Sequence, residues 1–193
     1  MRLILASASP IRRSMLEQAG VSFDIVPAAI DEAKVKRECA PAEAAAQRLA
    51  EAKALAVSRT CPADWVIGSD SIVTVDGRSF DKPRDRDEAT AHLRLFSGKP
   101  MRLTSAVALA QGEAVDWSHC ESATLFVRAL SDAFIDSYLD AEWPAVGGCV
   151  GVFRMEGRGV QLFDRVEGSH FTILGMPLVP LLGALRERGL VAS

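Results

Sequence analysis

The 193-residue sequence contains few cysteines and histidines, and those it has are scattered. The three histidines lie far apart, and no Cys-x-x-Cys pair occurs. This spacing indicates neither a zinc site nor a disulfide framework. We expect four reduced thiols, at Cys39, Cys61, Cys120 and Cys149.

Long apolar runs and blocks of like charge are also missing. The longest apolar stretches span about ten residues, against roughly 18 for a membrane span. Lys and Arg number 22 against 25 Asp and Glu, a formal charge of −3 at pH 7, which argues against nonspecific binding to a nucleic-acid backbone. The first residues only faintly imitate a signal peptide, because the apolar run stops at Ser7. We expect a cytoplasmic protein with no membrane or nucleic-acid partner, in which a local basic cluster meets any polyanionic ligand.

The residues that are present favour one α/β domain over residues 1–193. Hydrophobic residues make up 49% of the chain, enough for a substantial core, and no linker or repeat divides it. Strand and helix patterns alternate, which predicts a mixed sheet. We expect strands at 3–6, 66–75, 103–110 and 123–128, a Gly-rich strand region before the last helix, and helices at 10–19, 41–57, 85–96, from 131, and 178–188.

The first predicted helix has the features of an anion-binding site. Ser9 stands at its N-cap and Pro10 at its first position, so unpaired backbone N–H groups and the hydroxyls of Ser7 and Ser9 face one end. Arg12 and Arg13 lie in the same turn, where the helix dipole disfavours cations unless an anion compensates. A polyphosphate would fit. In the alternative interpretation both arginines are solvated and Ser9 only caps the helix.

A second candidate is a carboxylate inside an apolar strand. Asp70 follows Val66-Ile67-Gly68-Ser69, where an unpaired charge would be unfavourable. Asp76-Gly77 predicts a hairpin, and a three-residue turn would place Asp70 opposite Lys82 on one face. A two-residue turn would send Asp70 to the other face. We predict the three-residue form; a structural ion pair is the alternative.

These motifs occur together in one known family. The chain has Leu5-Ala6-Ser7-x-Ser9-Pro10-x-Arg12-Arg13, Asp31-Glu32, Val66-Ile67-Gly68-Ser69-Asp70, Asp81-Lys82-Pro83, Glu156-Gly157-x-Gly159 and Leu174-Gly175-Met176-Pro177-Leu178. In this order it resembles the Maf family of nucleoside triphosphate pyrophosphatases. The resemblance implies an elongated mixed sheet flanked by helices, with two lobes around a cleft, related to the inosine triphosphatase type.

The resemblance also implies a reaction and a set of roles. The family hydrolyses a nucleoside triphosphate to the monophosphate and pyrophosphate with Mg²⁺ or Mn²⁺. Asp70 would be the general base and would hold the metal with Glu32, while Lys82 would face the attacked phosphate. The remaining phosphate-binding positions implied are Ser7, Ser9, Arg12, Arg13 and Lys53. Water attack at phosphorus needs such a base and such cations.

Three positions that match the specificity positions of the family are Ile11, Ser71 and Glu156. Glu156 favours a guanine edge, because a carboxylate accepts from N–H groups where uracil or thymine needs a donor as well. With Phe153 as a stacking surface, the segment is most similar to the 7-methyl-GTP branch. Ile11 and Ser71 depart from that branch, so dTTP or UTP is the alternative. In the structural alternative, Phe153 belongs to the core and Glu156 forms an ion pair with Arg154 or Arg158.

Other functions stay open at this point. The enzyme reading is a house-cleaning hydrolase of nucleotide metabolism. Family members have also been linked to cell division, so a non-catalytic nucleotide-binding regulator is a second class. A nucleotidyltransferase would need an acceptor site, for which the sequence gives no sign. A homodimer is common in the family and is expected here only by that analogy.

Overall fold

The computed structural model describes residues 1–39 and 41–192, which form two compact units. The first unit comprises Met1–Ser71, Thr104–Glu121 and the C-terminal segment from Ser169. The second comprises Ile72–Leu103 and Ser122–Gly168. Three strands contribute residues to both units: β3 (Trp65–Val75), β5 (Pro100–Gln111) and β6 (Ala114–Val127).

The remaining elements belong to one unit each. The first unit holds β1 (Leu3–Leu5), α1 (Pro10–Gln18), β2 (Asp24–Ile25), α2 (Glu32–Glu38), α3 (Ala42–Ser58), α6 (His170–Ile173) and α7 (Leu178–Glu187). The second holds β4 (Arg78–Phe80), α4 (Arg86–Phe96), α5 (Asp132–Glu142), the 3₁₀ helices η1 (Ala145–Gly148) and η2 (Arg158–Leu162), and β7 (Phe163–Glu167).

The strands form one seven-stranded mixed sheet, as the sequence predicts. Its order is β2-β1-β3-β5-β6-β7, with β4 paired to β3. The pairs of β1 with β2 and β3 are parallel, and those of β3 with β4 and β6 with β7 are antiparallel. The expected α/β class with a mixed sheet and flanking helices is confirmed.

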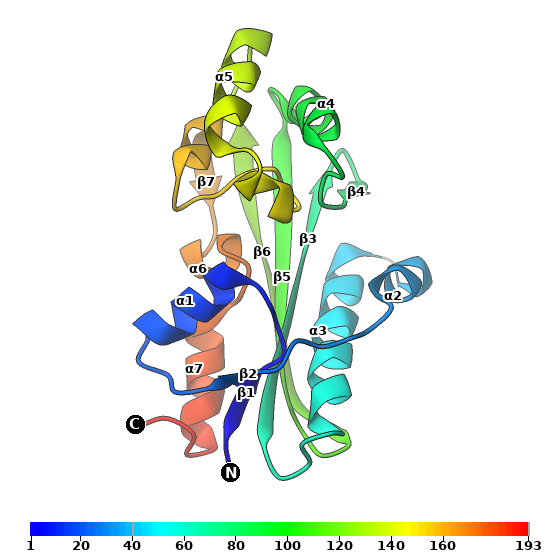
Figure 1. The fold of residues 1–193 in the computed structure, drawn as a ribbon, viewed down its shortest axis with the longest axis vertical. Helices are drawn as coiled ribbons and strands as arrows, with labels where there is room; N and C mark the ends of the chain where they lie inside the picture. Colours follow the sequence, from blue (N-terminus) through cyan, green and yellow to red (C-terminus); the bar gives the residue numbers. More distant parts are fainter. Residues whose placement is uncertain (40, 193) are drawn as a thin grey trace. The chain divides into compact units, whose positions relative to one another are not determined.

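One hydrophobic cluster of the first unit lies between the sheet and two helices. In Figure 1, α1 and α7 lie on one side of β1 and β3, and α3 lies on the other. Leu5 of β1 and Ile67 of β3 are fully buried with Leu16 of α1 and Leu181 of α7. Alternate residues of a strand face opposite sides, so the neighbouring residues of β1 and β3 face α3.

Local signals set several helix ends where the sequence predicts them. Ser9 is the N-cap of α1 and Pro10 its first residue, although the Ser9 side chain makes no capping hydrogen bond. The Asp85 side chain accepts a hydrogen bond from the Glu88 N–H at the start of α4, and Ser131 does the same for Phe134 in α5. These caps supply partners for N–H groups that a helix start leaves unpaired.

The predicted hairpin register is wrong. Val75 pairs with Arg78 and Val73 with Phe80, so the turn has two residues instead of three. Asp76 and Gly77 both have positive φ, 50° and 73°, as a type I′ turn requires, and the twist of that turn matches the twist of the strands. The register argument for Asp70 opposite Lys82 therefore fails, and Lys82 lies beyond the end of β4.

The Gly-rich segment of the second unit is mostly not strand, contrary to the prediction. It forms η1, turns and η2, and only β7 pairs with the sheet. The Tyr138 hydroxyl donates to the Val152 carbonyl over 3.0 Å and so ties this segment to α5. Among the described residues, no helix has the length and apolar character needed to cross a membrane.

Candidate active site

Three predicted site residues form one ion cluster in the first unit. The Lys53 Nζ lies 2.6 Å from Asp70 Oδ1 and 2.8 Å from Glu32 Oε1. The side chains of Lys53 and Asp70 are only 11% and 9% exposed, whereas that of Glu32 is 47% exposed. The ammonium of Lys53 therefore bridges two carboxylates, one buried and one open to solvent.

A glycine makes this cluster possible. A Cβ at Gly68 would lie 2.1 Å from the Ala50 carbonyl oxygen and 2.6 Å from the Ala54 nitrogen, both on α3. Without a side chain at Gly68, the helix approaches β3 directly. Gly68 and Asp70 share one face of the strand, so the close approach at the first brings Lys53 onto the second.

The opposite face of β3 holds Arg12, and protein groups occupy its guanidinium. Its Nε donates to the Gly175 carbonyl, Nη1 to the Ser69 carbonyl and the Ser7 hydroxyl, and Nη2 to the Ser71 hydroxyl, all within 3.3 Å. Burial lowers the pKa of Arg12, and the charges of Asp70 and Glu32 oppose that shift. Arg12 thus connects α1, β3 and the Gly175 turn within one unit.

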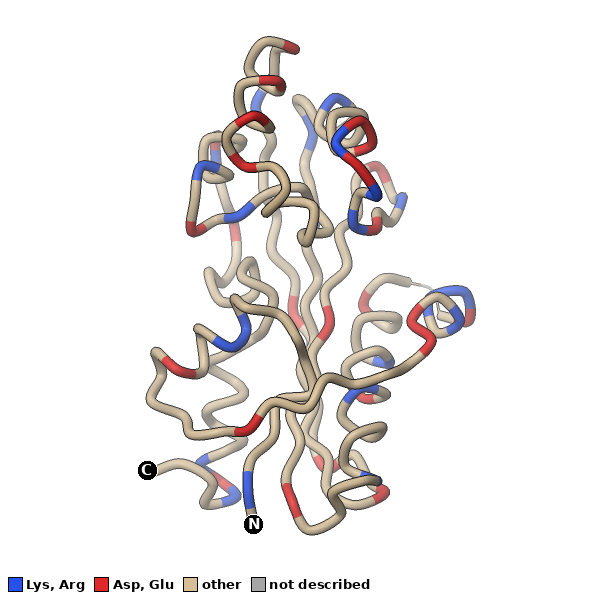
Figure 2. Tube along the Cα trace, in the orientation of Figure 1, with Lys and Arg blue, Asp and Glu red and all other residues tan. Residues whose placement is uncertain are grey.

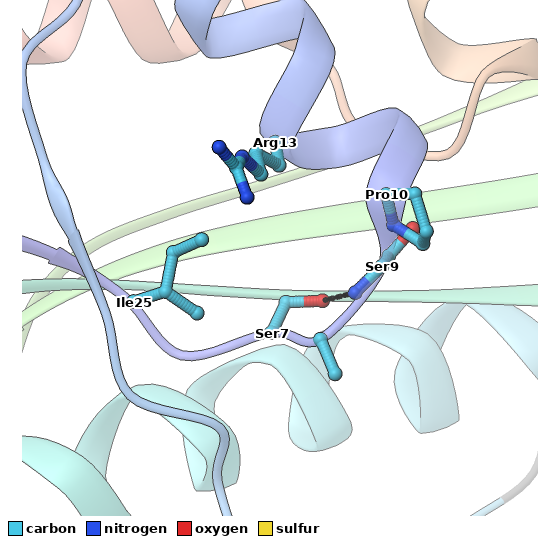
Figure 3. Close-up of a pocket in the computed structure, with 6 residues that line it drawn as sticks. Ser7, Ser9, Pro10, Arg13 and Ile25 are labelled. Atoms are coloured by element: carbon cyan, nitrogen blue, oxygen red, sulfur yellow. Dashed lines mark hydrogen bonds between the residues drawn. The ribbon is translucent and has the colours of Figure 1, made fainter.

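The loop before α1 lines a pocket. Ser7, Ser9, Pro10, Arg13 and Ile25 surround an open cavity of about 160 Å³ (Figure 3). The Ser9 N–H donates to the Ser7 hydroxyl over 3.3 Å, which folds the loop at the pocket edge. Arg13 lies across the pocket from Ser7, and its side chain is 58% exposed and paired with Glu17. The helix N-terminus, the hydroxyls and Arg13 can together receive an anion.

The remaining turn of this site is built around Gly175. Its carbonyl accepts from Arg12 and from the hydroxyls of Ser69 and Ser71. Its φ is +104°, and a Cβ there would lie 3.3 Å from Ser71 Oγ. The positive φ is the reason for glycine here, while a Cβ would need only a small shift of the Ser71 hydroxyl. The Ser71 hydroxyl also bonds Ser105 Oγ at 2.8 Å, so protein groups surround it.

A comparison with known families decides the identity. The sequence profile described as Maf-like protein matches residues 2–188. The chain belongs to the Maf family. Its relatives include a nucleoside triphosphate pyrophosphatase of Granulibacter bethesdensis, 48% identical over 97% of both chains. A 7-methyl-GTP pyrophosphatase of Rhizobium meliloti is 45% identical over 98% of this chain and 97% of its own.

A solved structure is also similar. It is a nucleoside-triphosphatase / dITP/XTP pyrophosphatase of Mycobacterium abscessus, 18% identical, with a TM-score of 0.42. The match covers 67% of this chain and 76% of the other. This likeness is too distant to bear on the site.

Four predicted residues of this Maf chain are not members of the ion cluster, and three of them belong to the second unit. Ile11 is half-buried in α1, while Lys82 belongs to the second unit and is exposed. Phe153 is buried edge-to-face against Phe163, with ring centroids 5.0 Å apart. Glu156 pairs with Arg154, at 3.3 Å. The roles of Lys82, Phe153 and Glu156 in the reaction stay predictions from the sequence.

Acidic and basic residues of the Maf chain are interspersed along the sequence. Figure 2 shows acidic and basic positions interspersed on α2, α3 and α4. Within the described residues, no group of three His, Cys, Asp or Glu side chains could hold a metal ion.

Proposed function

We propose that this chain hydrolyses a nucleoside triphosphate to the monophosphate and pyrophosphate, with Asp70 as general base. Its relatives carry the name nucleoside triphosphate pyrophosphatase, and it is an enzyme of that hydrolase class. One observation carries the assignment of the base. Asp70 is a buried carboxylate held by Lys53, in the same unit as the pocket lined by Ser7, Ser9 and Arg13.

The residues of the first unit meet the needs of this reaction. Water that attacks the α-phosphorus must lose a proton, and Asp70 supplies the acceptor. Negative charge on the leaving pyrophosphate needs cations and N–H groups, which Arg13 and the start of α1 supply. Since the four bonds of Arg12 go to protein groups, we assign Arg12 to holding the loop and Arg13 to direct contact with phosphate.

Glu32 and Asp70 are the residues that would hold Mg²⁺ or Mn²⁺. Both contact one cationic atom, Lys53 Nζ, so their oxygens are close enough to share a cation. Carboxylate oxygens are the donors that these hard cations prefer, and water and phosphate oxygens would complete the coordination. When bound, such an ion neutralises charge on the phosphates.

As the substrate, we propose a nucleotide with a guanine-type nucleobase, and 7-methyl-GTP as the first candidate. Glu156 supports this, since its carboxylate can accept from the N1–H and the exocyclic amine of guanine. Some relatives carry the name 7-methyl-GTP pyrophosphatase, and others carry the general name. UTP and dTTP are the competing substrates.

The test measures products with a panel of 7-methyl-GTP, GTP, UTP and dTTP in the presence of Mg²⁺. We expect pyrophosphate and the monophosphate, with the highest kcat/KM for 7-methyl-GTP. Glu156→Gln should reduce that preference, whereas Glu167→Gln, at an exposed ion pair with Arg165, should not. Orthophosphate release would refute the reaction. A preference for UTP or dTTP would refute the guanine assignment, and nucleotide binding without turnover would favour a regulator.

A further inference from the structure

Glu142 is a buried carboxylate for which the reaction above has no use. It is the last residue of α5, and its side chain is 10% exposed. Its Oε2 is buried and has no hydrogen-bond partner among the described residues. A buried charged oxygen without a hydrogen bond is unfavourable, so a state in which the oxygen gains a partner would be more stable.

Arg154 is the cation that pairs with Glu142, and it also pairs with a second carboxylate. Its Nη1 is 3.8 Å from Glu142 Oε2, beyond hydrogen-bond distance, while its Nε is 3.3 Å from Glu156 Oε1. The side chains of Arg154 and Glu156 are 39% and 38% exposed, so this pair faces solvent. One guanidinium therefore pairs with two carboxylates, and its contact with Glu142 lacks a hydrogen bond.

The backbone around Arg154 is tightly fixed. A Cβ at Gly159 would lie 2.5 Å from the Arg154 carbonyl oxygen, and the Gly157 N–H donates to that oxygen over 3.1 Å. Glu142 packs beside the same turn, because a Cβ at Gly157 would lie 3.5 Å from its Oε2. A change of partner by Arg154 is thus a side-chain movement on a fixed turn.

Acidic and basic side chains both act on the buried groups beside this pair. Burial raises the pKa of the Cys149 thiol, and the charges of Glu156 and Glu142 raise it further against Arg154 and Lys82. Burial and the same two acids also raise the pKa of Tyr138. A ligand that donates N–H groups can take the place of Arg154 as the partner of Glu156.

We propose that Glu142 is a specificity-positioning residue: it takes Arg154 from Glu156 and so frees the Glu156 carboxylate to accept from a guanine-type base. This rests on the proposed role of Glu156. Glu142 touches no substrate in this scheme and acts only through Arg154.

The first test separates recognition of the base from chemistry. In Glu142→Gln, Glu156 is the one acid left to Arg154 among the described residues. KM for 7-methyl-GTP should therefore rise about fivefold, the factor that corresponds to ~1 kcal/mol. The kcat for 7-methyl-GTP and the KM for UTP should stay within about twofold. In an Arg154→Gln background, Glu142→Gln should leave the KM for 7-methyl-GTP and the KM for UTP unchanged. Asp140→Asn, on the same helix and paired with Arg86, is the control. An equal rise of KM for both nucleotides, or the same rise without Arg154, would overturn the proposal.

The second test needs no nucleotide. Urea unfolding measures the free energy of unfolding of Glu142→Gln, Glu156→Gln and the double variant. The double variant should lose more of this free energy than the two single variants together, because either acid alone can hold Arg154. Additive losses of unfolding free energy would overturn the proposal that Arg154 changes partner between Glu156 and Glu142. If wild type treats 7-methyl-GTP and UTP alike, the role of Glu156 and its link to Glu142 both fail. The unfolding series still decides the exchange in that case.

Discussion

Lys53→Met tests whether the ammonium is what stabilises the two carboxylates. Methionine keeps the apolar stem and removes the charge, which leaves Asp70 buried without its cation. Removal of one partner from a buried pair costs about 3–5 kcal/mol. The contact with Glu32 adds little, because that side chain is 47% exposed. We expect a loss of about 3 kcal/mol in the free energy of unfolding at pH 7 without divalent metal.

Urea unfolding with EDTA, and then with Mg²⁺, measures this loss. In the variant, Lys53 no longer competes with Mg²⁺ for the Asp70 carboxylate, so the metal should bind more tightly and stabilise the variant more than wild type. Lys34→Met, at an exposed position of α2, is the control and should stay within about 0.5 kcal/mol of wild type. A Lys53→Met protein as stable as wild type in EDTA, or an equal gain from Mg²⁺ in both, would refute the reasoning.

Three further predictions follow from the packing and charges. Gly68→Ala should force α3 away from β3 and lower kcat at least tenfold while the protein stays folded by circular dichroism, and unchanged kcat would contradict the close approach. Arg13→Gln should raise KM with little change in Tm, whereas Arg12→Gln should lower Tm, because it removes four internal hydrogen bonds. Burial lowers the pKa of His92 in the folded protein. As the pH falls, His92 therefore becomes protonated in the unfolded chain before it does so in the folded one, and the free energy of unfolding should fall below about pH 6.5. His92→Phe should flatten that fall between about pH 6.5 and 5 in urea unfolding, and an unchanged slope would contradict it.

Sequence patterns predicted the elements whose ends depend on local chemistry. Ser9 and Pro10 mark the start of α1, and Asp85 marks the start of α4, because caps and fixed φ values act over one turn. The prediction of the hairpin register was wrong for a related reason. Asp76-Gly77 is compatible with turns of two or three residues, and the choice depends on Asp76 adopting a positive φ.

The contacts of the candidate site could be predicted only in part. The resemblance named Glu32, Lys53 and Asp70, yet their shared ion cluster depends on the packing of α3 at Gly68, which no local pattern encodes. Arg12 was expected to bind phosphate, and its bond to Gly175, 163 positions away, emerged only with the fold. Gly175 itself stands in the Gly-Met-Pro motif, which was the available signal.

The most direct test of the central claim is the activity of Asp70→Asn. The amide keeps the shape of the side chain and cannot take a proton from water, so pyrophosphate release with Mg²⁺ should fall by a factor of about 10² to 10⁴. Affinity for a non-hydrolysable α,β-linked triphosphate analogue, measured by calorimetry, should stay within about tenfold of wild type, because Arg13 and the start of α1 remain. Asp70→Asn with a rate near that of wild type would contradict Asp70 as the base.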